Sequence, residues 1–156
     1  MTSLPLHPLV VHAAVMLMVL VPLAVLVSLV WGGLRNRLDW LLPVGAIGAF
    51  VAAVVADRTG QDLVGQLKQG SELVAKHADL GEKGPWVAGV FAVATIGWWL
   101  TSSQVLATWV EARQPWLRRR PIQLVASILM AIASIVTLVV IYLIGDSGAT
   151  AVWTTR

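Results

Sequence analysis

The sequence predicts an all-α polytopic membrane protein, a four-transmembrane-helix bundle with a short amphipathic helical segment between spans two and three. Hydrophobic residues make up 58% of its 156 positions and charged residues 12%, which is too apolar for a soluble globular domain. Four long stretches carry no charged residue, and the charges gather between them. We therefore expect one transmembrane domain over residues 1–156, with spans at about 9–31, 40–56, 85–110 and 121–144.

The first span opens with two histidines, in the sequence Leu6-His7-Pro8-Leu9-Val10-Val11-His12. The 23 residues from Leu9 to Trp31 contain no charge, and a helix of that length extends about 34 Å, enough to cross a bilayer. Proline suits the first turn of a helix, so we expect His7 near the helix start and His12 about one turn inside. An ionisable side chain at that depth is costly unless another group bonds it.

The second span carries small residues that suit close packing against another helix: Gly45, Gly48, Ala49, Ala52, Ala53 and Ala56. We expect Asp57-Arg58-Thr59-Gly60 to end this span. Residues 61–84 are polar enough to leave the hydrocarbon, and their apolar positions recur at helical spacing, which predicts two short helices on the membrane surface. In the second of these helices, His77 lies within about 40° of Leu73 and Leu80 and faces the apolar side.

The charges of the connecting segments indicate how the spans are oriented. The turn at 34–39 and the segment 111–120 carry six arginines and two acidic residues, a net charge of +4. The opposite side carries five basic and six acidic residues, a net charge of −1. Because arginine-rich loops stay in the cytoplasm, we expect a multi-pass plasma-membrane protein whose two termini and middle segment are extracytoplasmic.

This topology brings all three histidines to the outer face, together with carboxylates that follow spans two and four. Imidazole and carboxylate groups are ligands of haem iron, zinc, copper and non-haem iron. At the inner face and in the bundle centre we expect no titratable group that could replace these histidines and carboxylates as ligands. The candidate haem ligands are His12 and His77, and the candidate metal ligands are His7, His12, His77, Asp57 and Asp146.

The candidates also have structural interpretations. His7 could be an N-cap or an interfacial residue, and His12 could be a buried polar residue bonded to a neighbouring helix. His77 could extend its ring from the apolar face toward water. Asp57 suits a carboxylate that flanks a helix end. The run Thr101-Ser102-Ser103-Gln104 suits hydrogen bonds to backbone carbonyl groups within the bundle.

The sequence lacks the residues that several kinds of chemistry require. It has no cysteine, which excludes disulfides, iron–sulfur clusters and thiolate chemistry. It also has no Gly-rich phosphate loop, no Ser-His-Asp order and no His-Glu-x-x-His site. An electron-transfer or structural membrane protein is therefore expected rather than an enzyme.

Four motifs occur in order along the chain: the segment 7–12, Asp57-Arg58-Thr59-Gly60, His77-Ala78-Asp79-Leu80-Gly81-Glu82 and the segment 145–153. Together they resemble the domain-of-unknown-function 2231 family of bacterial membrane proteins, over essentially the whole chain. The resemblance implies a four-span bundle without an agreed activity, and a Rieske-type domain fused to some relatives implies electron transfer. Asp146 stands where that family usually has a histidine, although aspartate also coordinates hard or borderline metals.

The leading hypothesis is a membrane protein that holds haem b or a transition metal near its outer face, with His12 and His77 as ligands. His7 or Asp146 would be a further ligand or would hydrogen-bond to a ligand. Two axial histidines fill both open positions of haem iron, which predicts one-electron transfer with a redox protein partner. The alternatives are a non-catalytic membrane subunit or assembly factor, and a small permease, which the uncharged bundle centre disfavours. The expected partners include the lipid bilayer and, as an open option, further copies of the chain, but no nucleic acid.

Overall fold

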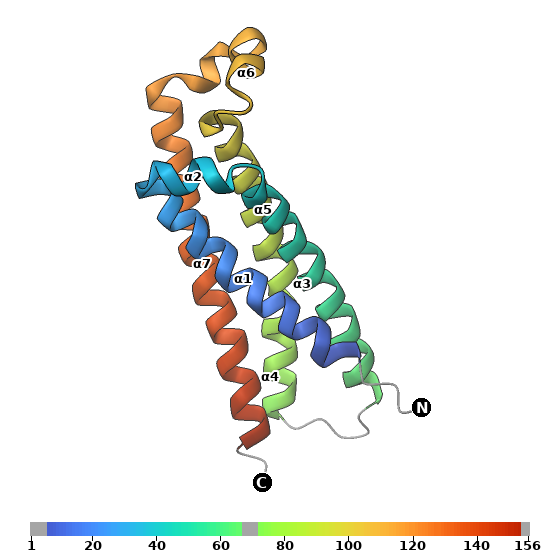
Figure 1. Cartoon of the computed structure of the whole chain (residues 1–156). Helices are drawn as coiled ribbons and strands as arrows, with labels where there is room; N and C mark the ends of the chain where they lie inside the picture. The colour runs from blue at the N-terminus through green and yellow to red at the C-terminus, as the bar shows by residue number, and fades with distance from the viewer. Residues whose placement is uncertain (1–5, 67–71, 154–156) are drawn as a thin grey trace.

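Four long helices form the body of the protein and run alternately in opposite directions (Figure 1). The computed structural model describes residues 6–66 and 72–153, and this part of the chain is helical without a strand. The long helices are α1 Leu6–Val30, α3 Leu41–Gln66, α5 Lys83–Ser102 and α7 Arg120–Trp153. Four helical stretches are long and apolar enough to cross a membrane, which confirms the predicted all-α membrane bundle.

Shorter elements connect the long helices: α2 Gly32–Leu38, α4 Glu72–Gly81, α6 Ala107–Arg113 and the 3-10 helix η1 Pro115–Arg118. α4 is the predicted amphipathic segment, and it leads into α5 through Glu82, whose backbone is also helical. α2, α6 and η1 lie at what we call the arginine end, formed by residues 31–40 and 103–120. The start of α1, the end of α3, α4 and the end of α7 form the opposite end, which we call the histidine end (Figure 1).

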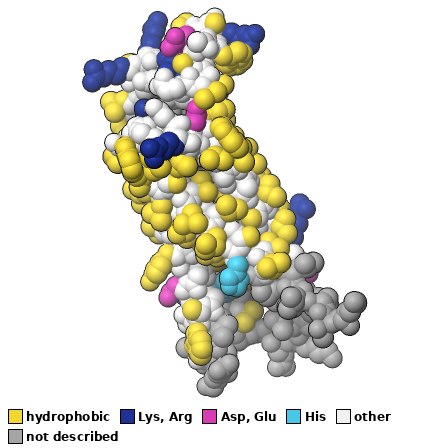
Figure 2. Space-filling model, viewed as in Figure 1, with side chains coloured by type: hydrophobic (Ala, Val, Ile, Leu, Met, Phe, Trp, Pro, Cys, Tyr) yellow, Lys and Arg dark blue, Asp and Glu magenta, His cyan; other side chains and the backbone are white. Residues whose placement is uncertain are grey.

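The four long helices pack as a closed ring, in which α1 contacts α3, α3 contacts α5, α5 contacts α7 and α7 contacts α1. Buried residues toward the arginine end include Val25, Leu42, Phe91, Trp98 and Met130. A second cluster toward the histidine end contains Met18, Ala49, Ala53, Ala88 and Ile141. Hydrophobic side chains also cover the outside of the ring (Figure 2), as expected of a surface that faces lipid.

The small residues of α3 face a neighbouring helix, as predicted. A Cβ built on Gly45 would lie 3.0 Å from Cγ2 of Val21, and one built on Gly48 would lie 3.7 Å from Cδ1 of Leu17. Both neighbours belong to α1. The missing side chains therefore bring α1 and α3 together, and side chains of α1 fill the space that the glycines leave.

α3 continues well beyond the predicted end of the second span at Ala56. Asp57-Arg58-Thr59-Gly60 lies inside the helix, where the amide of Gln61 donates to both carboxylate oxygens of Asp57 at 3.1 and 3.2 Å. This contact between neighbouring turns supports the continued helix. The prediction of a separate first short helix in 61–84 is therefore wrong, because residues 61–66 extend α3. Residues 67–71 lie outside the described residues.

Three further segments have helix bounds that differ from the expected spans and turn. The expected charged turn at 34–39 is largely the helix α2. α5 ends at Ser102 rather than near 110, because Ser103 leaves the helical conformation and its hydroxyl accepts a hydrogen bond from the backbone N–H of Leu106 at 3.2 Å. α7 continues past Ile144 to Trp153, since glycine weakens a helix without forbidding it and α4 packs against this stretch.

Candidate functional site at the histidine end

A contact between α4 and α7 defines the polar part of the histidine end. The Nδ1 of His77 lies 3.0 Å from the hydroxyl oxygen of Ser147. A Cβ built on Gly148 would lie 3.0 Å from Cε1 of the same ring, so the missing side chain lets the imidazole rest on α7. His77 shares its half-buried state with Leu73 and Leu80, which confirms that it faces the apolar side of α4.

A second hydrogen bond of Ser147 fixes the direction of the first. Its hydroxyl donates to the carbonyl oxygen of Ile144 at 2.8 Å, and a hydroxyl has a single hydrogen to donate. The Nδ1–H of His77 is therefore the donor in the contact with Ser147. In the neutral ring this leaves Nε2 unprotonated, with a lone pair that can accept a hydrogen bond or coordinate a metal ion.

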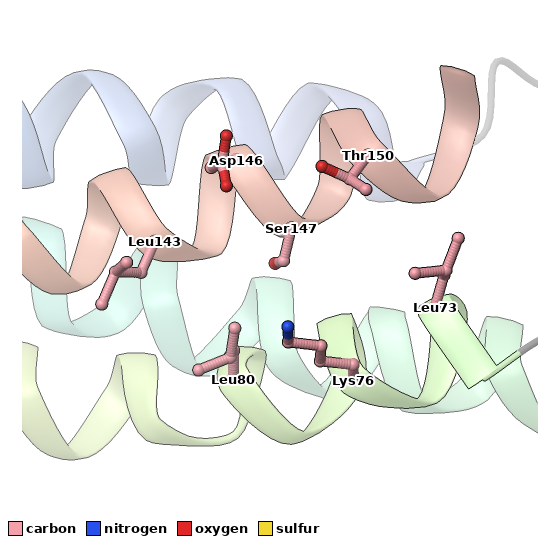
Figure 3. Close-up of a pocket in the computed structure, with 7 residues that line it drawn as sticks. All are labelled: Leu73, Lys76, Leu80, Leu143, Asp146, Ser147 and Thr150. Carbon is pink, nitrogen blue, oxygen red and sulfur yellow. The ribbon is translucent and has the colours of Figure 1, made fainter. Parts of the chain in front are cut away.

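A pocket of about 120 Å³ lies beside this contact, between α4 and α7 (Figure 3). Its lining combines two oppositely charged side chains with hydroxyl and leucine side chains: Leu73, Lys76, Leu80, Leu143, Asp146, Ser147 and Thr150. The amine of Lys76 extends from α4 toward α7 in Figure 3.

His12 lies on a different surface. Its side chain is exposed. Each residue turns a helix by about 100°, which places His12 roughly 140° from the buried stripe of α1. That stripe contains Ala14, Met18, Val25 and Ser28. α4 packs chiefly against α7, with smaller contacts to α3 and α5, so His12 and His77 lie on elements that are not main packing neighbours.

The remaining candidates are also dispersed. His7 is the second residue of α1, and the prediction for its side chain lies outside the described residues. Asp57 is half-buried on α3 and accepts its hydrogen bonds from Gln61. Asp146 is exposed on α7 beside Ser147 and lines the pocket.

The structure thus brings His77 and Asp146 to the same helix pair, whereas His12 lies on α1 and Asp57 on α3. Within the described residues, no group of three or more His, Asp or Glu side chains is arranged to hold a metal ion. The small residues of α3 also leave no slot beside α1, because Val21 and Leu17 fill it. These contacts do not provide the two facing imidazoles that a bis-histidine haem needs.

A buried carboxylate at the arginine end was missed by the sequence analysis. Asp39 is only 6% exposed, and it accepts hydrogen bonds from Nε1 of Trp99 at 2.5 Å and from the hydroxyl of Ser103 at 3.1 Å. The carbonyl oxygen of Ser103 in turn accepts a bond from Nη1 of Arg118 at 2.8 Å, and Nε of Arg118 lies 3.1 Å from the Glu111 carboxylate.

One feature of the sequence could have revealed this cluster. The polar run 101–104 ends span three at the same membrane face as Asp39, so its hydroxyl groups were available to a carboxylate. Thr101 and Ser102 do donate to the carbonyl oxygen of Trp98, at 2.8 and 2.9 Å, as predicted. Ser103 departs from that pattern because it follows the last helical residue and its side chain turns to Asp39.

Comparison of the chain with protein-family models, with curated proteins and with solved structures finds no match. The family resemblance of the four motifs stays a prediction.

Proposed function

We propose that the chain is a non-catalytic membrane subunit or assembly factor, whose polar clusters join its helices and whose lipid-facing helices offer surfaces to other membrane proteins. The observation that carries the proposal is the contact of His77 with Ser147. It engages the Nδ1 of the imidazole in a bond between two helices, directly over a glycine. A ring held in this way acts as a packing element of the histidine end.

The arginine end supports the same interpretation. The buried carboxylate of Asp39 has two donors, from α5 and from the residue that follows it. A buried charge whose acceptor oxygens are both bonded stabilises one arrangement of helices and needs no ligand. Both polar clusters therefore have a structural use that requires no cofactor.

The proposal includes an orientation. The arginine end carries the net charge of +4 and would lie in the cytoplasm of a cell whose plasma membrane holds the protein. The start of α1, the end of α7 and α4 would then lie outside. A subunit with this arrangement would expose α4 and the pocket beside it to extracytoplasmic partners.

A transition-metal site is the second candidate, and one observation favours it. Because Nδ1 of His77 donates to Ser147, Nε2 carries the lone pair, and a metal-bound histidine is commonly oriented in this way by its other nitrogen. Asp146 lies beside Ser147 on α7 as a potential carboxylate ligand. Electron transfer through such a site would need further ligands and a redox partner.

Purified protein separates the two candidates. For the subunit, we expect no Soret band and no stoichiometric metal by elemental analysis of the full chain in dodecyl maltoside. His77→Ala should lower the melting temperature by about 3–6 °C, because a hydrogen bond and packing worth about 1–2 kcal/mol are lost. Lys83→Ala, at an exposed position, should change it by less. A bound haem, or one metal ion per chain that His77→Ala removes, would overturn the subunit proposal.

A further inference from the structure

The positive charge of the arginine end is not neutralised within the described chain. This end carries six arginines, but its ion pairing is limited to Arg118 with Glu111. The other carboxylate, Asp39, is buried and accepts its bonds from Trp99 and Ser103 rather than from an arginine. Arginine side chains, dark blue in Figure 2, accordingly project from this end.

Among the arginines of this end, Arg35 and Arg118 are half-buried, and the others are exposed. The Nε of Arg35 is buried and has no hydrogen-bond partner among the described residues. A Cβ built on Gly32 would lie 3.7 Å from its Nη2, which shows that the guanidinium folds back over the first turn of α2. An arginine cannot lose its proton, so a partly desolvated guanidinium without a counter-charge favours binding of an anion.

Aromatic residues place this charge at the depth of lipid headgroups. Four tryptophan residues at the arginine end are 49–58% exposed: Trp31, Trp40, Trp109 and Trp116. Exposed tryptophans are typical of the membrane–water interface. The guanidinium carbon of Arg113 lies 4.9 Å from the centre of the Trp109 ring, so on α6 an arginine also lies beside an exposed tryptophan.

We propose that the arginine end binds the headgroup of an anionic phospholipid, with the phosphate at Arg35 and with Arg37, from the same short helix, adding to the attraction. The planar fork of arginine matches phosphate geometry, and basic sites beside membrane helices commonly recognise anionic headgroups. The occupant is a lipid rather than an acidic protein segment, because Arg35 and Arg37 belong to α2, which is flanked by the exposed tryptophans Trp31 and Trp40. The proposal does not depend on which function the histidine end serves.

Lipid titration of the purified full chain tests the site. We would measure native mass spectra and the melting temperature in dodecyl maltoside with phosphatidylglycerol, and with phosphatidylcholine of the same acyl chains. Phosphatidylglycerol should bind at least tenfold more tightly and raise the melting temperature, while inorganic phosphate should not. Arg35→Gln should remove most of this preference.

Lys83→Gln is the matched control, because it removes the same charge from an exposed position at the histidine end. It should bind phosphatidylglycerol like the unmodified chain. If Arg35→Gln does not fold, the exposed pair Arg37→Gln and Arg119→Gln should still weaken the preference measurably. Equal binding of the two lipids, an unchanged preference in the arginine variants, or displacement of the lipid by an acidic polypeptide would overturn the proposal.

Discussion

Nε1 of Trp99 lies 2.5 Å from Oδ1 of Asp39, and this hydrogen bond joins α5 to the residue that ends α2. The N–H is the only polar group of a tryptophan side chain, so this hydrogen bond fixes the positions of both the ring and the carboxylate. Ser103 completes the arrangement from the other carboxylate oxygen. The short helix α2 is thereby attached to the bundle through its last turn.

Asp39→Ala should lower the free energy of unfolding by about 2 kcal/mol, because the donors of Trp99 and Ser103 lose a charged acceptor at a buried position. Reversible unfolding in mixed micelles of dodecyl maltoside and sodium dodecyl sulfate measures this change. Asp79→Ala, exposed on α4, is the control and should change the unfolding free energy by less than about 0.5 kcal/mol.

The same pair allows a double-mutant cycle. Trp99→Phe combined with Asp39→Ala should show a coupling free energy of about 1–2 kcal/mol, because each single change removes the same charged hydrogen bond. Additive effects of the two changes would contradict the role assigned to this bond. The measurement is the same unfolding experiment on all four proteins.

Gly148→Ala should act through His77. In the unmodified chain the new methyl group would displace the imidazole, since its Cβ would lie 3.0 Å from Cε1, and the bond to Ser147 would weaken. This loss should offset the gain of about 1 kcal/mol in helix propensity. In a His77→Ala background the obstacle is gone, so the same substitution should stabilise the protein by about 0.5–1 kcal/mol.

Gly145→Ala is the control for that comparison, because a Cβ at this exposed position of α7 would meet nothing within 4 Å. It should stabilise the protein equally with and without His77. If Gly148→Ala behaves like Gly145→Ala in both backgrounds, the contact of the ring with α7 does not exist. Melting temperatures in dodecyl maltoside suffice for this test.

The fold was predictable because its main signals are long and local. Uncharged stretches of membrane-spanning length identify four helices, and the period of α4 places His77 on its inner face. The ends were not predictable from the same signals, since α3 passes through a charged motif whose residue Asp57 is bonded one turn along the helix by Gln61. Hydropathy marks where a helix leaves the hydrocarbon and not where it stops.

The candidate site was harder to predict for a physical reason. Topology brings residues to one membrane face, but the rotation of each helix decides which of them meet. His12 and His77 share a face of the membrane, yet the buried stripe of α1 turns His12 outward while α7 receives His77. Asp39 was missed because its partners Trp99 and Ser103 follow it by 60 and 64 residues, beyond any local pattern.

Gly45→Leu should destabilise the bundle by about 1–3 kcal/mol, because even a Cβ would lie 3.0 Å from Val21 and a larger side chain would force α1 and α3 apart. Gly97→Leu on α5 is the control, since nothing lies within 4 Å of its Cβ position and the residue is exposed. Similar unfolding free energies for the two variants would show that the small residues of α3 do not set the distance between the helices.

The orientation of the chain can be tested with single cysteines, because the natural sequence has none. Asn36→Cys lies exposed on α2 at the arginine end, and Asp79→Cys lies exposed on α4 at the histidine end. A membrane-impermeant thiol reagent added to intact spheroplasts should label Asp79→Cys at once. It should label Asn36→Cys only after the membrane is opened, because arginine-rich loops are retained in the cytoplasm.

The charge difference itself should cause this orientation. Replacing four exposed arginines with glutamine reduces the arginine end from +4 to zero, close to the −1 of the opposite side: Arg37, Arg113, Arg119 and Arg120. Without a charge difference, both orientations should form, and each cysteine should be labelled in only a fraction of the protein molecules in intact spheroplasts. Exclusive labelling of Asp79→Cys in this background would mean that another feature orients the chain. Exclusive labelling of Asn36→Cys in the unmodified background would place the histidine end in the cytoplasm and reverse the proposed topology.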